Sequence, residues 1–205
     1  QAEDGIRDHC VTGVQTCALP IFDCLNRIEV EPGDCVRLPS GICHALGAGV
    51  LVAEAQTPSD TTFRVWDWDR NDPDRPLHLE AAMECMRFGD RQEDGMPAVT
   101  RLLEVPVLEH AGAATRRLCI TPDFTIDHVV IGESSYAIST DQEPTVLLGV
   151  DGRARVTDQE GRSTRLIPGD TVLVPAGTAA PEVLAEPEAT FLRIDLPSIS
   201  PRALA

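Results

Sequence analysis

The chain has 205 residues, of which 42% are hydrophobic and 24% charged, and its 33 acidic and 17 basic side chains give a formal net charge of −16 at pH 7. Such an acidic surface argues against nucleic acid or an anionic membrane as the main partner. No apolar stretch approaches the roughly 18 residues that a membrane-spanning helix needs, so the composition predicts a soluble, folded protein.

Two residue types restrict the chemistry further. Every basic side chain is Arg, and the absence of Lys excludes a Schiff-base mechanism and a P-loop phosphate lysine within this chain. Beyond residue 21 the cysteines are odd in number and form no CxxC pair: Cys24, Cys35, Cys43, Cys85 and Cys119. Buried, reduced thiols in a cytoplasmic protein are therefore preferred to disulfides or a zinc knuckle.

The first 21 residues, QAEDGIRDHCVTGVQTCALPI, have no initiator Met and no helical or alternating apolar period. Their acidic start also differs from the basic start of a signal peptide. Written back into codons, residues 1–8 and 11–21 match the fixed parts of a common short-read sequencing adapter, and residues 9–10 fall at its barcode. We interpret residues 1–21 as an adapter-derived artefact and expect a truncated natural sequence to start at Phe22.

Residues 31–50, EPGDCVRLPSGICHALGAGV, predict a turn at Pro32–Asp34, a short strand, and a second turn at Pro39–Gly41. A second strand is expected to begin near His44 and to direct its side chain into a barrel. Because zinc needs about three protein ligands, the pattern alone favours an ordinary hydrogen-bonded histidine over a metal ligand.

Three further polar residues follow in AEAQTPSDTTFRVWDWDR, namely Glu54, Asp60 and Arg64. The alternation in TTFRVWDWD predicts a strand with Asp67 on the face opposite Arg64. A cleft-facing arginine needs an acidic partner or an anionic ligand. An ion pair of Arg64 with Asp60 or Glu54 and an anion-binding role are both open from the residues alone, and Glu54 could equally be a solvated carboxylate.

The segment PLHLEAAMECMRFG, residues 76–89, predicts one clear helix. Its apolar stripe is expected at Leu79, Met83 and Met86, and Gly89 ends it. His78 is predicted to lie at the surface. The polar, turn-rich segment RQEDGMPAV that follows predicts a domain boundary.

The C-terminal half is predicted to be β-structure. IPGDTVLVPAGTAAPEVLAE, residues 167–186, repeats the PGD and P-x-G spacing of residues 31–50, and hairpin turns are expected at Asp151–Gly152 and Glu160–Gly161. His128, in FTIDHVVIG, is expected to be packed or at the surface. Turn, short strand and turn, repeated with few helical periods, predict small antiparallel barrels or jelly rolls.

Three motifs carry a family resemblance: P-S-G-x-x-H-A-x-G at 39–47, S-D-T-T-F-R-V-x-D-W-D-R at 59–70 and LHLE at 77–80. Together they resemble the second half of the catalytic cupin of type I mannose-6-phosphate isomerase. The resemblance covers residues 22–205 and is only architectural in the second half. It implies a mainly β bicupin, with jelly-roll barrels and one interposed helix. Residues 22–91 would be the C-terminal part of an incomplete catalytic cupin, and residues 92–205 a degenerate cupin.

The resemblance also implies a function, which is the zinc-dependent interconversion of mannose 6-phosphate and fructose 6-phosphate through a cis-enediol. In the family, the residue matching His44 binds the metal, the one matching Arg64 is the catalytic arginine, and those matching Glu54 and Asp60 are active-site acids. The family's Gln-x-His pair, further Glu and phosphate-binding Ser and Lys would precede Phe22, so this chain is expected to be inactive. In residues 167–186, which repeat the spacing of residues 31–50, Ala180 takes the place of His44.

Two alternatives remain open from the sequence. A non-catalytic bicupin that binds or senses a sugar phosphate would need none of the missing ligands and would tolerate the loss of Arg64. A metal-dependent cupin oxygenase would need two or three His and a Glu in one barrel, and only His44 is in place. Fold analogy cannot separate these functions, because cupins host many chemistries.

Overall fold

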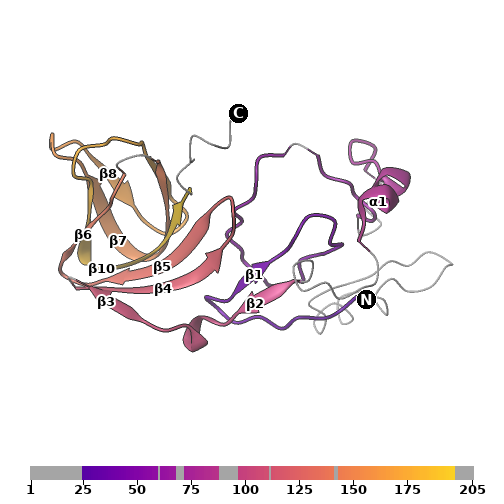
Figure 1. Ribbon diagram of the computed structural model, residues 1–205, viewed down its shortest axis with the longest axis horizontal. Coiled ribbons are helices and arrows are strands. Elements are labelled where there is room, and N and C mark those ends of the chain that lie inside the picture. Colours follow the sequence, from indigo (N-terminus) through magenta and orange to yellow (C-terminus); the bar gives the residue numbers. More distant parts are fainter. Residues whose placement is uncertain are drawn as a thin grey trace. The chain divides into compact units, whose positions relative to one another are not determined.

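The computed structural model describes residues 25–59, 61–67, 72–87, 97–110, 112–140 and 143–196 (Figure 1). Residues 1–21 and Phe22, on which the adapter and truncation hypotheses rest, lie outside these ranges. The chain divides into two compact units. Unit 1 comprises Gln1–Glu31 and Arg37–Ala98, and unit 2 comprises Pro32–Val36 and Val99–Ala205.

The described chain is mainly β-structure with one α-helix and one short 3-10 helix, as predicted for the fold class. In order, the elements are β1 (Cys35–Arg37), α1 (Leu79–Cys85), β2 (Ala98–Thr100), η3 (Leu102–Glu104), β3 (Leu108–His110), β4 (Ala113–Ile120), β5 (Thr125–Ile131), β6 (Ser135–Ala137), β7 (Thr145–Thr157), β8 (Ser163–Leu166), β9 (Thr171–Val174) and β10 (Glu182–Asp195).

The described residues of unit 1 have little regular structure besides α1. No strand forms near His44 or over residues 61–67, the described part of TTFRVWDWD, so both of these predictions were wrong. The apolar stripe of α1 was also misplaced. Leu79 and Met83 are 54% and 59% exposed, whereas Ala82 is only 3% exposed and is the one buried residue among those described in this unit. A stretch with so small a core cannot gain much stability from apolar burial.

Unit 2 is built around one antiparallel sheet with strand order β3-β4-β5-β10-β7-β8, to which β6 and β9 pair at β10 and β7. The long strand β10 lies at the centre (Figure 1). Its second half pairs with β5 on one side and β7 on the other, and its first half pairs with β6 and the end of β7. Between the two halves the register with β7 shifts, which lets the sheet bend around a core.

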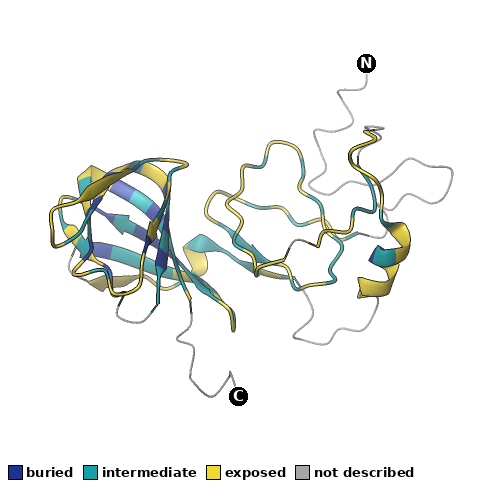
Figure 2. Cartoon of the chain, turned by 90° about the horizontal axis from the view of Figure 1, so that it is seen from above, coloured by how far each residue is buried: buried dark blue, intermediate teal, exposed yellow. Residues whose placement is uncertain are grey.

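The core of unit 2 lies on the inner face of these strands, where Figure 2 shows the buried stretches. Alternate residues of β5 and β10 point inward, among them Val129, Ile131 and Phe191, each 0% exposed. Phe191 packs edge-on against Tyr136, with ring centroids 5.7 Å apart. Buried and less buried residues alternate along much of β10, as expected for a strand with one face on a core.

The predicted turns are mostly present. Pro168–Asp170 joins β8 to β9, with the Asp170 N–H donating to the Ile167 carbonyl, and Gly161 has φ +77° in the turn between β7 and β8. The hairpin predicted at Asp151–Gly152 is wrong, because β7 continues through both residues. Gly152 has φ +70° there because β7 kinks at its register shift with β10.

The four described cysteines, Cys35, Cys43, Cys85 and Cys119, form no disulfide with one another. The expectation that they are buried was wrong: Cys35, Cys43 and Cys119 are only partly buried, and Cys85 is exposed at the end of α1. Burial and the neighbouring Cys119 thiol raise the pKa of Cys35 to about 11. Among the described residues, no helix is long and apolar enough to cross a membrane.

Candidate active site

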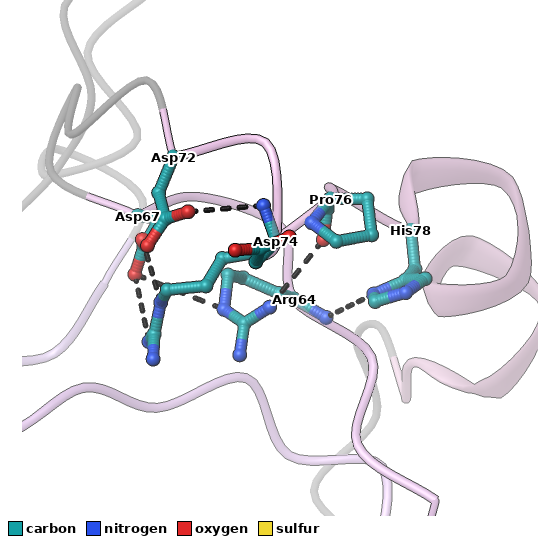
Figure 3. A network of polar contacts seen from close by, with 7 residues as sticks. Arg64, Asp67, Asp72, Asp74, Pro76 and His78 are labelled. Atoms are coloured by element: carbon teal, nitrogen blue, oxygen red, sulfur yellow. Dashed lines mark hydrogen bonds and ion pairs between the residues drawn. The ribbon is translucent and has the colours of Figure 1, made fainter.

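Arg64 lies at the centre of a polar network in unit 1 (Figure 3). Its side chain is 24% exposed, and its Nη1 donates to the Pro76 carbonyl at 3.4 Å. Two hydrogen bonds tie its backbone to His78: the Arg64 N–H donates to His78 Nδ1 at 3.2 Å, and the His78 N–H donates to the Arg64 carbonyl at 2.7 Å. The start of α1 therefore fixes the backbone that carries the guanidinium.

Asp67 supplies the negative charge of this network. Its carboxylate is 13% exposed and lies 3.7 Å from Nε of Arg64. It also accepts two hydrogen bonds from Arg75, at 2.9 and 3.1 Å, a bidentate arrangement that fixes its orientation. The hydrogen bond and charge of Asp67 raise the pKa of Arg75. One largely buried carboxylate thus contacts two arginines, and the charge of Asp72 also acts on Arg75.

The acidic neighbour of Arg64 differs from the one predicted. The sequence suggested Asp60 or Glu54 and placed Asp67 on the opposite face. The described residues 61–67 form no strand, so strict alternation does not hold there, and Asp67 meets Arg64 instead. Glu54 is exposed and makes no ion pair with Arg64 among the described residues, and Asp60 lies outside the described ranges.

His44 is exposed, and its Nδ1 lies 2.9 Å from the Ile42 carbonyl. A carbonyl can only accept, so Nδ1 carries the proton in this contact and Nε2 has a free lone pair. That tautomer suits a metal ligand. Within the described ranges no group of three His, Cys, Asp or Glu side chains could hold a metal ion, so these residues alone do not make a zinc site.

Sequence reasoning missed three members of the network, Asp67, Arg75 and His78. His78 was predicted at the surface but is half-buried, with its ring 6.1 Å from that of Phe63. Its position just before the first helical residue would have suggested a capping hydrogen bond, but the His78 side chain makes none and accepts from Arg64 instead. The contact between Arg75 and Asp67 joins two irregular segments, and no periodic pattern encodes it.

Unit 2 has a second polar cluster at one end of its inner face. Arg117 forms a bidentate ion pair with Asp127, whose side chain is 5% exposed, and the contact raises the pKa of Arg117. Arg193 donates to Asp195 and, at 2.9 Å, to the hydroxyl of Tyr136. Each arginine has its own carboxylate, so the cluster is electrically balanced. Ala180, which takes the place of His44 here, is exposed in the loop before β10.

Comparison with known proteins finds relatives by sequence and by structure. No protein-family model matches the chain. A mannose-6-phosphate isomerase of Streptococcus mutans is 34% identical over 137 residues, which are 65% of this chain and 40% of that protein. Mannose-6-phosphate isomerase ManA of Bacillus subtilis is 46% identical over 65 residues, 30% of this chain and 21% of that protein. The chain is homologous to mannose-6-phosphate isomerases.

The fold agrees with this homology. The crystal structure of the mannose 6-phosphate isomerase from Bacillus subtilis superposes with a TM-score of 0.67 and 23% identity, over 83% of this chain and 51% of that one. This match supports the fold alone. The chain spans about 40% of the Streptococcus relative and about half of the solved structure. A bicupin with an incomplete first barrel stays a prediction.

Proposed function

We propose that this chain is part of a zinc-dependent mannose-6-phosphate isomerase, which interconverts mannose 6-phosphate and fructose 6-phosphate through a cis-enediol in the cytoplasm. The observation that carries the proposal is the 34% identity over 137 residues to an isomerase of that name. The network around Arg64 supports it, because hydrogen bonds to His78 and Pro76 and the ion pair with Asp67 hold a cationic side chain in a fixed position.

Arg64 is the proposed catalytic arginine. Moving a proton between C1 and C2 of the sugar develops negative charge on two neighbouring oxygens. A guanidinium is always charged and presents parallel N–H donors, so it can stabilise that charge. Nη1 and Nε of Arg64 face Pro76 and Asp67, while the described residues give Nη2 no hydrogen-bond partner. We assign Nη2 to the sugar oxygens.

The remaining roles follow the family resemblance. We propose that Glu54 and Asp60 help to move the proton. We propose His44 as one zinc ligand, because its Nδ1 is bonded to Ile42 and its Nε2 is free. The other ligands would have to come from outside the described residues, so no catalytic step is assigned to the metal here. A bound zinc would polarise the sugar oxygens.

The poor burial of unit 1 is consistent with a larger protein. Leu46, Leu51, Leu79 and Met83 are 55%, 99%, 54% and 59% exposed. So many exposed large apolar side chains, with Ala82 the one buried residue among those described in this unit, favour further polypeptide that covers them. We therefore expect the chain by itself to be inactive.

A chimera tests the proposal. The N-terminal part of Bacillus subtilis ManA would be joined ahead of residues 22–205, and isomerase activity would be measured in the presence of zinc. We expect activity in the chimera and none in the chain alone. Arg64→Ala should lower kcat by about 100-fold or more, and Arg64→Lys should restore little, because it lacks the parallel donors. Arg153→Ala, at an exposed arginine of unit 2, is the matched control. Full activity in Arg64→Ala would favour the non-catalytic alternative.

A further inference from the structure

Cys35 and Cys119 are far apart in the sequence, yet their thiols share a hydrogen bond. Both residues belong to unit 2, Cys35 as the first residue of β1 and Cys119 near the end of β4. Both side chains are partly buried. Because a disulfide requires two sulfur atoms to meet, thiols that are already in contact are the preferred pair for oxidation.

The residues just before Cys35 anchor it to unit 2. Asp34 forms an ion pair with Arg101, and the Asp34 side chain is 5% exposed. Asp34 also accepts a hydrogen bond from the backbone N–H of Leu102 at 3.4 Å. Gly33 lies so close to Leu102 that a Cβ atom there would overlap the leucine side chain. The backbone that carries Cys35 is therefore held by contacts other than the thiol hydrogen bond.

A bulge in β4 decides which way Cys119 faces. Arg117 of β4 pairs with Asp127 of β5. Cys119 pairs with Ile126, and the register shifts between these two pairs. Paired residues on neighbouring strands point to the same face, whereas adjacent residues of one strand point to opposite faces. Without the bulge Cys119 would share the inner face with Arg117. The bulge places it on the outer face, where its thiol meets that of Cys35.

We propose that Cys35 and Cys119 form a reversible disulfide by exchange with a low-molecular-weight disulfide, and that this bond fixes β1 to β4. The bond closes a loop over residues 36–118, which include His44, Arg64 and His78. Such a cross-link restricts the unfolded chain and so stabilises the folded one. The proposal does not depend on the isomerase assignment, because neither cysteine belongs to the candidate active site.

The exchange has two steps. A Cys119 thiolate attacks one sulfur of the small disulfide RSSR, whose S–S bond breaks, and RS⁻ leaves. Cys35 then loses its proton and attacks the Cys119 sulfur, which forms the protein disulfide and releases the second RS⁻. Two protein thiols are oxidised, one RSSR is reduced to two RSH, and the two protons pass through solvent to RS⁻. Burial, and then the charge and hydrogen bond of Cys119, raise the pKa of Cys35 to about 11, so the second step is slow at neutral pH.

Peptide mapping tests the proposal. The full chain would be incubated with excess oxidised glutathione at about pH 8, where thiolates are more abundant than at neutral pH. The remaining thiols would be blocked with iodoacetamide, and tryptic peptides would be mapped without reduction. Trypsin cuts after arginine, so the four described cysteines fall in four separate peptides. We expect residues 28–37 linked to residues 118–153 as the main product, within a single chain of 22.1 kDa.

The linked chain should also melt about 5 °C or more above the reduced chain, because the bond closes a long loop. Dithiothreitol should reverse both the link and the rise in Tm. Cys35→Ser and Cys119→Ser should each abolish both effects. Cys85→Ser, at the exposed cysteine of α1, is the matched control and should change neither.

The mapping uses the parent chain, so its result does not depend on whether the variants fold. A main product that joins Cys43 or Cys85 to another cysteine would overturn the proposal. So would a glutathione adduct that persists on Cys119 with no link to Cys35, a link between two chains, or a linked chain that melts at the same temperature as the reduced one.

Discussion

Two hydrogen bonds join Arg64 and His78. The His78 side chain accepts a hydrogen bond from the backbone N–H of Arg64 at 3.2 Å, and the backbone N–H of His78 donates to the Arg64 carbonyl at 2.7 Å. An accepting Nδ1 requires the proton of a neutral imidazole to be on Nε2. The position of the proposed catalytic arginine therefore depends on a residue fourteen positions later in the chain.

Replacing His78 should release the backbone of Arg64. In His78→Leu we expect the Arg64 amide to exchange with deuterium about fivefold to tenfold faster, since a hydrogen bond worth about 1 kcal/mol is lost. His78→Asn is the matched control, because its amide oxygen can take the place of Nδ1 and should preserve slow exchange. Equal exchange in His78→Leu and the parent chain would show that the contact does not stabilise Arg64.

The ion pair between Arg117 and Asp127 should respond unequally to the loss of either partner. The Asp127 side chain is 5% exposed, whereas that of Arg117 is 45% exposed and can regain water. Arg117→Met leaves the buried Asp127 carboxylate without its ion-pair partner and should lower the free energy of unfolding by about 2 kcal/mol. Asp127→Asn should lower the free energy of unfolding by about 1 kcal/mol. Urea denaturation followed by circular dichroism measures both, and the reverse order would contradict this account.

Gly149 has no room for a side chain. It is buried in β7, and a Cβ atom there would overlap the carbonyl oxygen of Ile167. Gly149→Ala should lower the free energy of unfolding by about 2 kcal/mol, because the backbone must shift to accept the methyl group. Gly132→Ala is the matched control, since nothing lies within 4 Å of its added Cβ. Thermal unfolding of both variants checks the prediction, and equal losses would refute it.

His128 should make unit 2 less stable in mild acid. Burial, and secondarily the charge of Arg116, lower its pKa from the ordinary value of 6.5. Between the lowered value and 6.5 the unfolded state binds more protons, so the free energy of unfolding falls as the pH drops below about 6.5. His128→Leu should remove this part of the pH dependence, measured by urea denaturation at about pH 7.5 and pH 5.5. An unchanged slope in the variant would contradict it.

Cys35 should react slowly with iodoacetamide at neutral pH. Alkylation requires the thiolate, and the raised pKa of about 11 leaves very little of it. Cys85 is exposed and serves as the internal comparison. Peptide mapping after a short reaction should find Cys85 modified well before Cys35. Modification of Cys35 first would mean that its side chain is more accessible than the structure shows.

Much of unit 2 could be predicted from the sequence because its signals are local. Gly161 and Pro168–Asp170 form turns through conformations that Gly and Pro favour, and the strand-like segment FTIDHVVIG contains β5. The hairpin predicted at Asp151–Gly152 does not form. Asp-Gly favours a hairpin, but β10 pairs with β7 on both sides of this position, and that pairing keeps the strand continuous.

The sequence by itself determined the mainly β composition, the helix near residue 80, the turns, and Arg64 as a candidate site residue through its family motif. Only the tertiary structure decided the partners of that arginine. Asp67 meets it because the segment is not a strand, and His78 meets it because the chain folds back at Pro76. Periodic patterns report the local backbone, whereas contacts between irregular segments depend on how the whole chain packs, and no short pattern encodes them.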